Sequence, residues 1–211
     1  MEQLPKVKIM YSEFLDEVFT IFSTSDNFQE STSFKKVSFP KILTKDQLLE
    51  KQKVFKSEWL KYESKIFRVM CELTTLTFNR NVIDVYIVRA TPRTFARPII
   101  ICGLISHEEF VRILTHETVH LLLESLGDSK QKLDKILTKM FPDESRVTRI
   151  HIVVYSILAC IYEVIFPDID KMVLEKKSAK NHRTKEYTRS IEIAESYGYK
   201  KIIDDLKIAM L

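Results

Sequence analysis

The sequence predicts a predominantly helical α+β protein, and two observations support this fold class. The chain of 211 residues contains only 3 glycines and 6 prolines, fewer than the tight turns of an all-β protein would need. Long stretches with helical spacing of apolar residues flank a short middle segment rich in β-branched residues. At this length we expect a single domain over residues 1–211, with a helical N-terminal region at 1–80 and C-terminal helices at 168–211.

The N-terminal region is expected to be mainly helical. Apolar residues recur at helical spacing over 8–22, and a polar loop follows at 23–33. A short strand is possible at 35–39. Residues 45–78 lack Gly and Pro and are rich in good helix formers, so we expect one long helix there, straight or bent.

The middle of the chain is expected to contain two strands, at 82–88 and 98–105, joined by a turn at Pro92. Ser106 then fits the N-cap of a helix, with Glu109 as its capping-box partner. This helix should run over 107–125 and stop at Gly127, because glycine readily adopts the left-handed conformation that ends helices.

Further helices are expected towards the C-terminus. Apolar periodicity and capping residues predict one helix at 129–140 and an almost wholly apolar one that opens near 142–145 and ends at Phe166. From residue 168 we expect two or three charged helices, separated by a solvated basic loop at 176–185 and by Gly198.

Composition and charge exclude several classes of protein. The net charge of +4 is modest and spread along the chain, so nucleic acid is permitted as a partner but not indicated.

Cys71, Cys102 and Cys160 lack paired spacing, and we expect buried free thiols in an intracellular, cytoplasmic protein. No signal-type segment opens the chain. The longest apolar run, at 152–166, is shorter than the roughly 20 residues of a membrane span, so no membrane partner is expected.

Two histidines in the predicted helix at 107–125 indicate a metal site. His116 and His120 are four residues apart, so both imidazoles project from one helix face and can bind one ion. Glu117 lies about 100° around the helix and can reach a water bound to that ion. A catalytic Zn²⁺ has three protein ligands and lowers the pKa of its water, while a glutamate accepts the proton. The pattern therefore predicts hydrolysis, most often of an amide.

The segment HETVH at 116–120 resembles the HExxH signature of zincin-type zinc metallopeptidases. Two β-like segments, the motif helix and a second long helix also resemble the small zincin core, which would occupy 82–166. The resemblance implies that His116 and His120 bind Zn²⁺ and that Glu117 is the general base. It also implies that a peptide or protein substrate pairs with part of the strand at 98–105.

The chain departs from the better-known branches of that family. Leu123 and Leu126 stand where the metzincin pattern has a glycine and a histidine, so the chain is not a metzincin. Gluzincins take a glutamate from the next helix, after Asn and four residues before Asp, whereas Glu163 follows Tyr162 and precedes Pro167 by four. We therefore expect a small divergent member, neither metzincin nor clear gluzincin.

The third zinc ligand has two candidates on the apolar helix, His151 and Glu163. They are roughly 18 Å apart at 1.5 Å per residue, so only one of them can share an ion with His116 and His120. If the two helices run side by side, His151 lies at the level of the motif histidines, and Tyr155, one turn further, could stabilise the oxyanion. Glu163 is the alternative, because a carboxylate in an apolar run needs a partner.

The leading hypothesis is a zinc-dependent metallopeptidase, and the alternative is a non-catalytic, zinc-containing zincin-fold module that binds protein or nucleic acid. The large helical flanks and the mild basic excess motivate the alternative. His107 and His182, the remaining histidines, are expected to be solvated surface residues.

Overall fold

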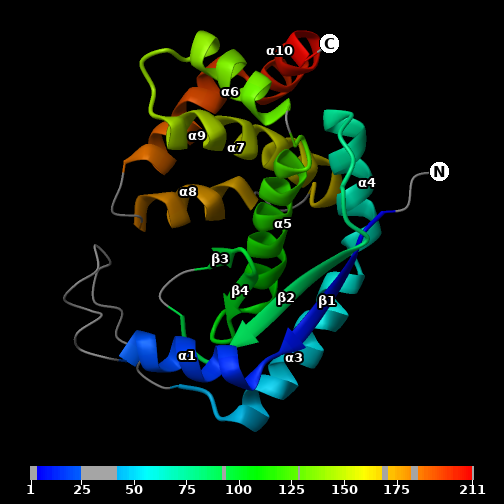
Figure 1. Ribbon diagram of the computed structural model, residues 1–211, viewed down its shortest axis with the longest axis vertical. Coiled ribbons are helices and arrows are strands. Elements are labelled where there is room, and N and C mark those ends of the chain that lie inside the picture. Colours follow the sequence, from blue (N-terminus) through cyan, green and yellow to red (C-terminus); the bar gives the residue numbers. More distant parts are fainter. Residues whose placement is uncertain are drawn as a thin grey trace. The chain divides into compact units, whose positions relative to one another are not determined.

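The computed structural model describes residues 4–24, 42–91, 94–127, 129–167, 171–181 and 185–210 (Figure 1). Over these ranges the chain is predominantly helical with one four-stranded mixed sheet, which confirms the predicted α+β class. The strand predicted at 35–39, the turn at Pro92 and His182 lie outside the described residues.

The chain forms two compact units, which are interleaved in the sequence. One, here called the sheet unit, comprises Gln3–Glu63 and Arg80–Glu117; the other, the helical unit, comprises Ser64–Asn79 and Thr118–Leu211. The boundary falls inside one continuous helix. The expectation of a single domain stays a prediction.

The sheet has the strand order β1-β2-β4-β3. Its strands are β1 (Lys6–Tyr11), β2 (Val82–Val88), β3 (Phe95–Ala96) and β4 (Ile99–Cys102). β1 and β4 both pair in parallel with β2, and β3 pairs antiparallel with β4. β4 therefore has neighbours on both sides at Ile99 and Ile100, so the expectation that this strand is free to pair with an extended substrate is wrong there.

The predicted helix at 8–22 is wrong at its start, because β1 occupies Lys6–Tyr11 and helix α1 runs only over Glu13–Thr24. β1 is held by backbone pairing with β2, about 76 residues further along, which no local spacing reveals. Phe14 and Ile21, which contributed to the helical pattern, have 73% and 66% of their surface exposed. The apolar spacing therefore did not mark a buried helix face.

The single long helix predicted at 45–78 is also wrong, since the structure has α3 (Lys45–Leu60) and α4 (Glu63–Thr74) with a turn between them. Glu63 helps to fix the turn. Its Oε1 atom accepts hydrogen bonds from the Val7 backbone N–H at 2.7 Å and from Trp59 Nε1 at 3.1 Å. A tertiary contact to β1 thus competes with continuation of the helix.

The motif helix α5 (His107–Glu124) begins and ends as predicted. Ser106 Oγ accepts the backbone N–H of Glu109 at 3.2 Å, which satisfies one of the free N–H groups of the first turn. Gly127 follows the helix with a φ of 52°. Within the sheet unit the rings of Phe110 on α5 and Phe55 on α3 stack at 4.4 Å, which anchors the first half of α5.

The helical unit is built around α7, which contacts all four other helices of the C-terminal half. These elements are α6 (Ser129–Met140), α7 (Arg146–Ile165), α8 (Lys171–Asn181), α9 (Glu186–Tyr197) and α10 (Tyr199–Met210). The predicted loop at 176–185 is wrong in its first part, because helix α8 continues to Asn181. The run is rich in lysine, which is a good helix former, so its charge alone did not indicate a loop.

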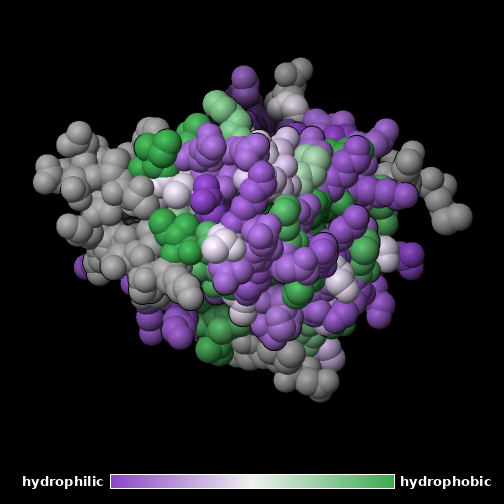
Figure 2. Space-filling model, turned by 90° about the horizontal axis from the view of Figure 1, so that it is seen from below, coloured by the Kyte–Doolittle hydropathy of each residue, from purple (hydrophilic) through white to green (hydrophobic). Residues whose placement is uncertain are grey.

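Helix α7 is nearly continuous in its apolar character, and residues 152–162 are all buried. Among the described helices it is the one long and apolar enough to cross a bilayer, a property that core helices share. Of its most apolar 18-residue stretch, 67% is buried inside the protein. One face of the molecule, seen in Figure 2, is mostly hydrophilic, with hydrophobic side chains in small separate groups among the described residues.

Candidate metal centre

Helix α5 presents the motif side chains from a largely buried stretch. Leu114, Val119 and Leu121 are at most 2% exposed and lie on other sides of the helix. His116, Glu117 and His120 are each half-buried. The apolar sides of the helix are therefore buried, whereas the three polar side chains are partly exposed to solvent.

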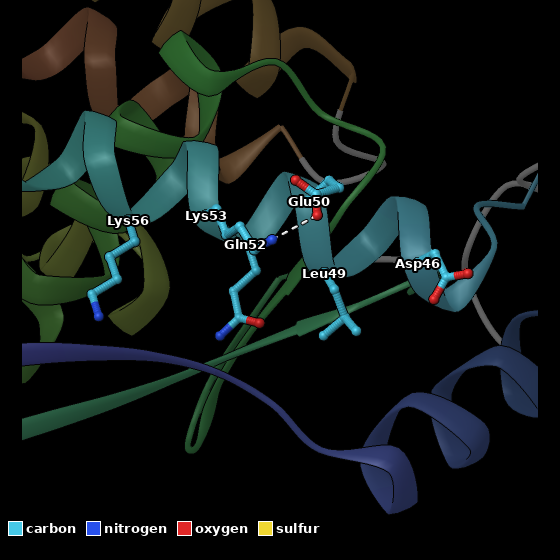
Figure 3. Close-up of a pocket in the computed structure, with 6 residues that line it drawn as sticks. All are labelled: Asp46, Leu49, Glu50, Gln52, Lys53 and Lys56. Atoms are coloured by element: carbon cyan, nitrogen blue, oxygen red, sulfur yellow. Dashed lines mark hydrogen bonds and ion pairs between the residues drawn. The ribbon is translucent and has the colours of Figure 1, made fainter.

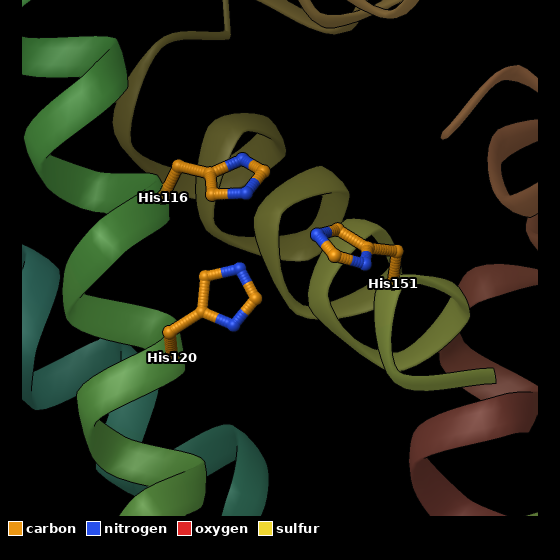
Figure 4. Close-up of side chains that lie close together, drawn as sticks. All are labelled: His116, His120 and His151. Atoms are coloured by element: carbon orange, nitrogen blue, oxygen red, sulfur yellow. The ribbon is translucent and has the colours of Figure 1, made fainter. Parts of the chain in front are cut away.

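Helix α7 supplies the third histidine. Its N-cap is Ser145, whose side chain accepts the backbone N–H of Thr148 at 3.1 Å, so the helix starts at Arg146 and His151 lies in its second turn. One ligand nitrogen from each of His116, His120 and His151 lies within 4.8 Å of the other two (Figure 4). His116 precedes His120 by one turn of the same uninterrupted helix, so helix geometry fixes their relative positions.

The three rings are oriented for shared coordination. In Figure 4 each imidazole turns one nitrogen toward the space between α5 and α7. The rings of His120 and His151 pack edge to face, with centroids 5.1 Å apart and an angle of 68°.

The orientation of His151 is set by a backbone contact. Its Nδ1 atom lies 2.9 Å from the carbonyl oxygen of Val147, one turn earlier on α7. A carbonyl accepts only, so the neutral imidazole carries its proton on Nδ1 and keeps the lone pair on Nε2. A backbone carbonyl that accepts the other ring N–H is a common partner of a zinc-binding histidine.

The donor set fits a zinc ion. Zn²⁺ binds imidazole nitrogen at about 2.0 to 2.1 Å in tetrahedral geometry, which places ligand nitrogens roughly 3.4 Å apart. The nitrogens of the three histidines lie within 4.8 Å of one another, so small side-chain rotations would bring them to that spacing. Three imidazoles leave one position of a tetrahedral ion for water, as in catalytic sites.

Two tyrosines flank His151, and one of them was predicted. Tyr155, one turn along α7, is 2% exposed, and its ring centroid lies 6.0 Å from that of His151. Tyr187, at the start of α9, is closer at 4.5 Å and packs edge to face at 69°. Sequence reasoning missed Tyr187, because it comes 36 residues after His151 and no local spacing links the two.

Glu163, the alternative third ligand, is not among the three residues brought together. Its side chain is 63% exposed, and its carboxylate forms an ion pair with Lys200 at 3.1 Å. It is twelve residues from His151 on a continuous helix, or roughly 18 Å. Near the end of the helix, the carboxylate is therefore solvated and paired with a lysine.

His107 is exposed at the first turn of α5 and contacts Glu108 at 2.8 Å.

A hollow on the sheet unit offers no comparable chemistry. It encloses about 440 Å³ along one face of α3 (Figure 3). Its lining residues are Asp46, Leu49, Glu50, Gln52, Lys53 and Lys56. Lys53 and Glu50 form an ion pair at 2.6 Å, and Gln52 donates to the carbonyl oxygen of Ile9 at 2.8 Å. None of the six is a histidine or cysteine, so we interpret these residues as a solvated face of α3.

Comparisons with protein-family models, with curated proteins and with solved structures found no match for this chain. The function therefore has to be inferred from the chemistry of the site itself.

Proposed function

We propose that this protein is a zinc-dependent metallopeptidase in which His116, His120 and His151 hold the ion and Glu117 is the general base. The observation that carries the proposal is the meeting of three histidines from two separate helices, with ligand nitrogens within 4.8 Å of one another. Two of the three come from an HExxH segment, whose glutamate is placed by helix geometry beside its first histidine.

The order of elements supports a zincin-like core. Short strands β2 and β4 precede the motif helix α5, and a second long helix, α7, follows it and supplies the third histidine. The extra helix α6 and the helices after α7 lie outside the predicted core at 82–166. The pairing of β4 with β3 argues for a substrate contact other than simple addition of a strand to β4.

In the proposed reaction each of these residues has a separate role. A zinc ion bound by the three histidines would supply a water of lowered pKa and polarise the substrate carbonyl. The carboxylate of Glu117 accepts a proton from the attacking water and donates it to the leaving amide nitrogen as the C–N bond breaks. Tyr155 donates a hydrogen bond to the carbonyl oxygen as negative charge develops on it. The Val147 carbonyl keeps His151 in the tautomer that coordinates.

Metal analysis tests the first half of the proposal. The purified chain should contain about one zinc ion, and His116→Ala should lose it, since two imidazoles hold zinc far more weakly than three. His107→Ala is the matched control, because His107 lies exposed on the same helix and contacts Glu108. A natively folded chain that neither contains zinc nor takes it up would refute the proposal.

Peptide hydrolysis tests the second half. Glu117→Gln should abolish cleavage of a mixed peptide library while the zinc content stays at the wild-type level. Glu108→Gln, an exposed change on the same helix, should leave cleavage unchanged. If the zinc-loaded wild-type chain cleaves no peptide but binds DNA or RNA in a salt-sensitive manner, the non-catalytic alternative replaces the peptidase.

A further inference from the structure

Helix α9 contributes a residue to the surroundings of the histidine cluster. Tyr187, in its first turn, packs edge to face against His151, with ring centroids 4.5 Å apart and an interplanar angle of 69°. Both residues belong to the helical unit, so the contact lies within one compact part of the chain. Of the aromatic rings described against His151, that of Tyr187 is the closest, ahead of His120 at 5.1 Å and Tyr155 at 6.0 Å.

Helix α9 is firmly attached to α7 on both sides of Tyr187. Ser190, which is fully buried, donates from its Oγ atom to the carbonyl oxygen of Thr148 at 3.1 Å. Glu186, directly before Tyr187, accepts a hydrogen bond from the Ser145 side chain. These contacts flank the tyrosine in sequence and end on the first turn of α7, just before His151. The backbone on either side of Tyr187 is therefore held against the first turn of α7.

The imidazole of His151 is thus constrained in two ways. The contact of Nδ1 with the Val147 carbonyl favours the tautomer with its proton on Nδ1, and edge-to-face packing with the Tyr187 ring limits rotation of the imidazole plane. His151 is also the ligand that comes from the second helix, so its orientation decides whether three nitrogens meet.

We propose that Tyr187 is a positioning residue, which holds the His151 ring in the orientation that coordinates the metal. The inference rests on the proposed zinc site, and it assigns a role to the C-terminal helices, for which the motif itself gives no function. Loss of an outer hydrogen-bond partner of a metal-binding histidine typically lowers metal affinity 10- to 100-fold. A packing partner should act at the lower end of this range, so we expect a weakening of roughly tenfold when the ring is removed.

The test compares zinc affinities by competition with a chromogenic chelator. Tyr187→Leu, which keeps apolar volume but removes the ring, should bind zinc roughly tenfold more weakly than the wild-type chain. Tyr187→Phe should bind with wild-type affinity, because the ring packing survives. The matched control is Tyr197→Ala, at the other end of α9, where the ring packs on Phe141 at 5.8 Å and is remote from His151. It should leave zinc affinity unchanged.

A spectroscopic measurement separates positioning from simple loss of stability. With Co²⁺ in place of zinc, the visible absorption bands report ligand geometry, and Tyr187→Leu should shift them while Tyr197→Ala should not. Equal zinc affinity and identical bands in Tyr187→Leu and wild type would overturn the inference and leave the zinc site intact. Equal weakening in Tyr197→Ala, or failure of Tyr187→Phe to restore binding, would overturn it as well. A wild-type chain that binds no zinc would overturn the proposed function and this inference together.

Discussion

The Nδ1 atom of His151 lies 2.9 Å from the carbonyl oxygen of Val147, one turn back on the same helix. His151 is also one of three histidines whose ligand nitrogens lie within 4.8 Å of one another, the others being His116 and His120. For a histidine that served only for packing, contact with two further imidazoles would add little stability. Of the two candidates for third ligand, His151 lies beside the motif histidines, whereas Glu163 pairs with Lys200.

Replacing each candidate in turn tests this distinction. His151→Ala should raise the dissociation constant for zinc by roughly 100-fold or more, because loss of a direct ligand exceeds the 10- to 100-fold cost of losing an outer partner. Glu163→Gln, on the same helix but paired with Lys200 at the surface, should leave it unchanged. Isothermal titration with zinc measures both. The opposite ranking would assign the third ligand to Glu163.

Tyr155→Phe is expected to slow catalysis without loss of metal. The hydroxyl is the only group removed, and the ring stays packed beside His151 at a site that is 2% exposed. If the hydroxyl stabilises the oxyanion, kcat for peptide cleavage should fall roughly 100-fold with zinc content and KM little changed. A kcat equal to that of the wild-type chain would show that Tyr155 acts only in packing.

The sheet unit should depend on a partly buried ion pair between Asp16 on α1 and Arg89, which directly follows β2. Asp16 is fully buried and accepts hydrogen bonds from the backbone N–H of Arg89 at 2.7 Å and from its Nε atom at 2.6 Å. Asp16→Ala leaves both donors unpaired, and we expect the free energy of unfolding to fall by about 3 kcal/mol in urea denaturation. Glu13→Ala on the same helix removes an exposed pair with Lys45 and should change it far less. Equal losses would contradict the prediction.

The buried thiol of Cys160 should react slowly in the folded protein. Burial raises the pKa of Cys160, and it also raises the pKa of Cys102. The folded pKa then exceeds the unfolded one, so the stabilisation of the protonated thiol is complete below the unfolded pKa and is lost as pH rises through the folded pKa. At pH 8, alkylation of Cys160 by iodoacetamide should be at least roughly tenfold slower than in the unfolded chain, as followed by mass spectrometry. Equal rates would show that the site is open.

Local signals in the sequence predicted the helices that carry the site. The N-cap of α5 at Ser106, its end before Gly127, and the N-cap of α7 at Ser145 all depend on residues within a few positions of each helix end. The HExxH spacing is equally local, because one turn of helix brings its two histidines together. His151 could be anticipated only by assuming that the second helix lies beside the first.

Features that depend on distant residues escaped prediction. A helix was predicted where β1 lies. The strand forms by pairing with β2, which is far away in the sequence, and the spacing of nearby residues cannot reveal such a pairing. The break between α3 and α4 depends on Glu63, whose carboxylate binds the backbone of Val7. Tyr187 meets His151 only because α9 folds back on α7. In each case tertiary contact overrides what the local pattern favours.

The pairing of β1 with β2 also sets an order of events during synthesis. Lys6–Tyr11 leaves the ribosome long before Val82–Val88, so β1 cannot pair with β2 until about 76 further residues have been added. Closing so long a loop carries an entropic cost that must be met before the sheet gains its backbone hydrogen bonds. Lys6 and Lys8 place positive charge on β1 while it is unpaired, and this charge disfavours its pairing with edge strands of other protein molecules. The sheet is thus completed late, because its paired strands β1 and β2 are translated about 76 residues apart.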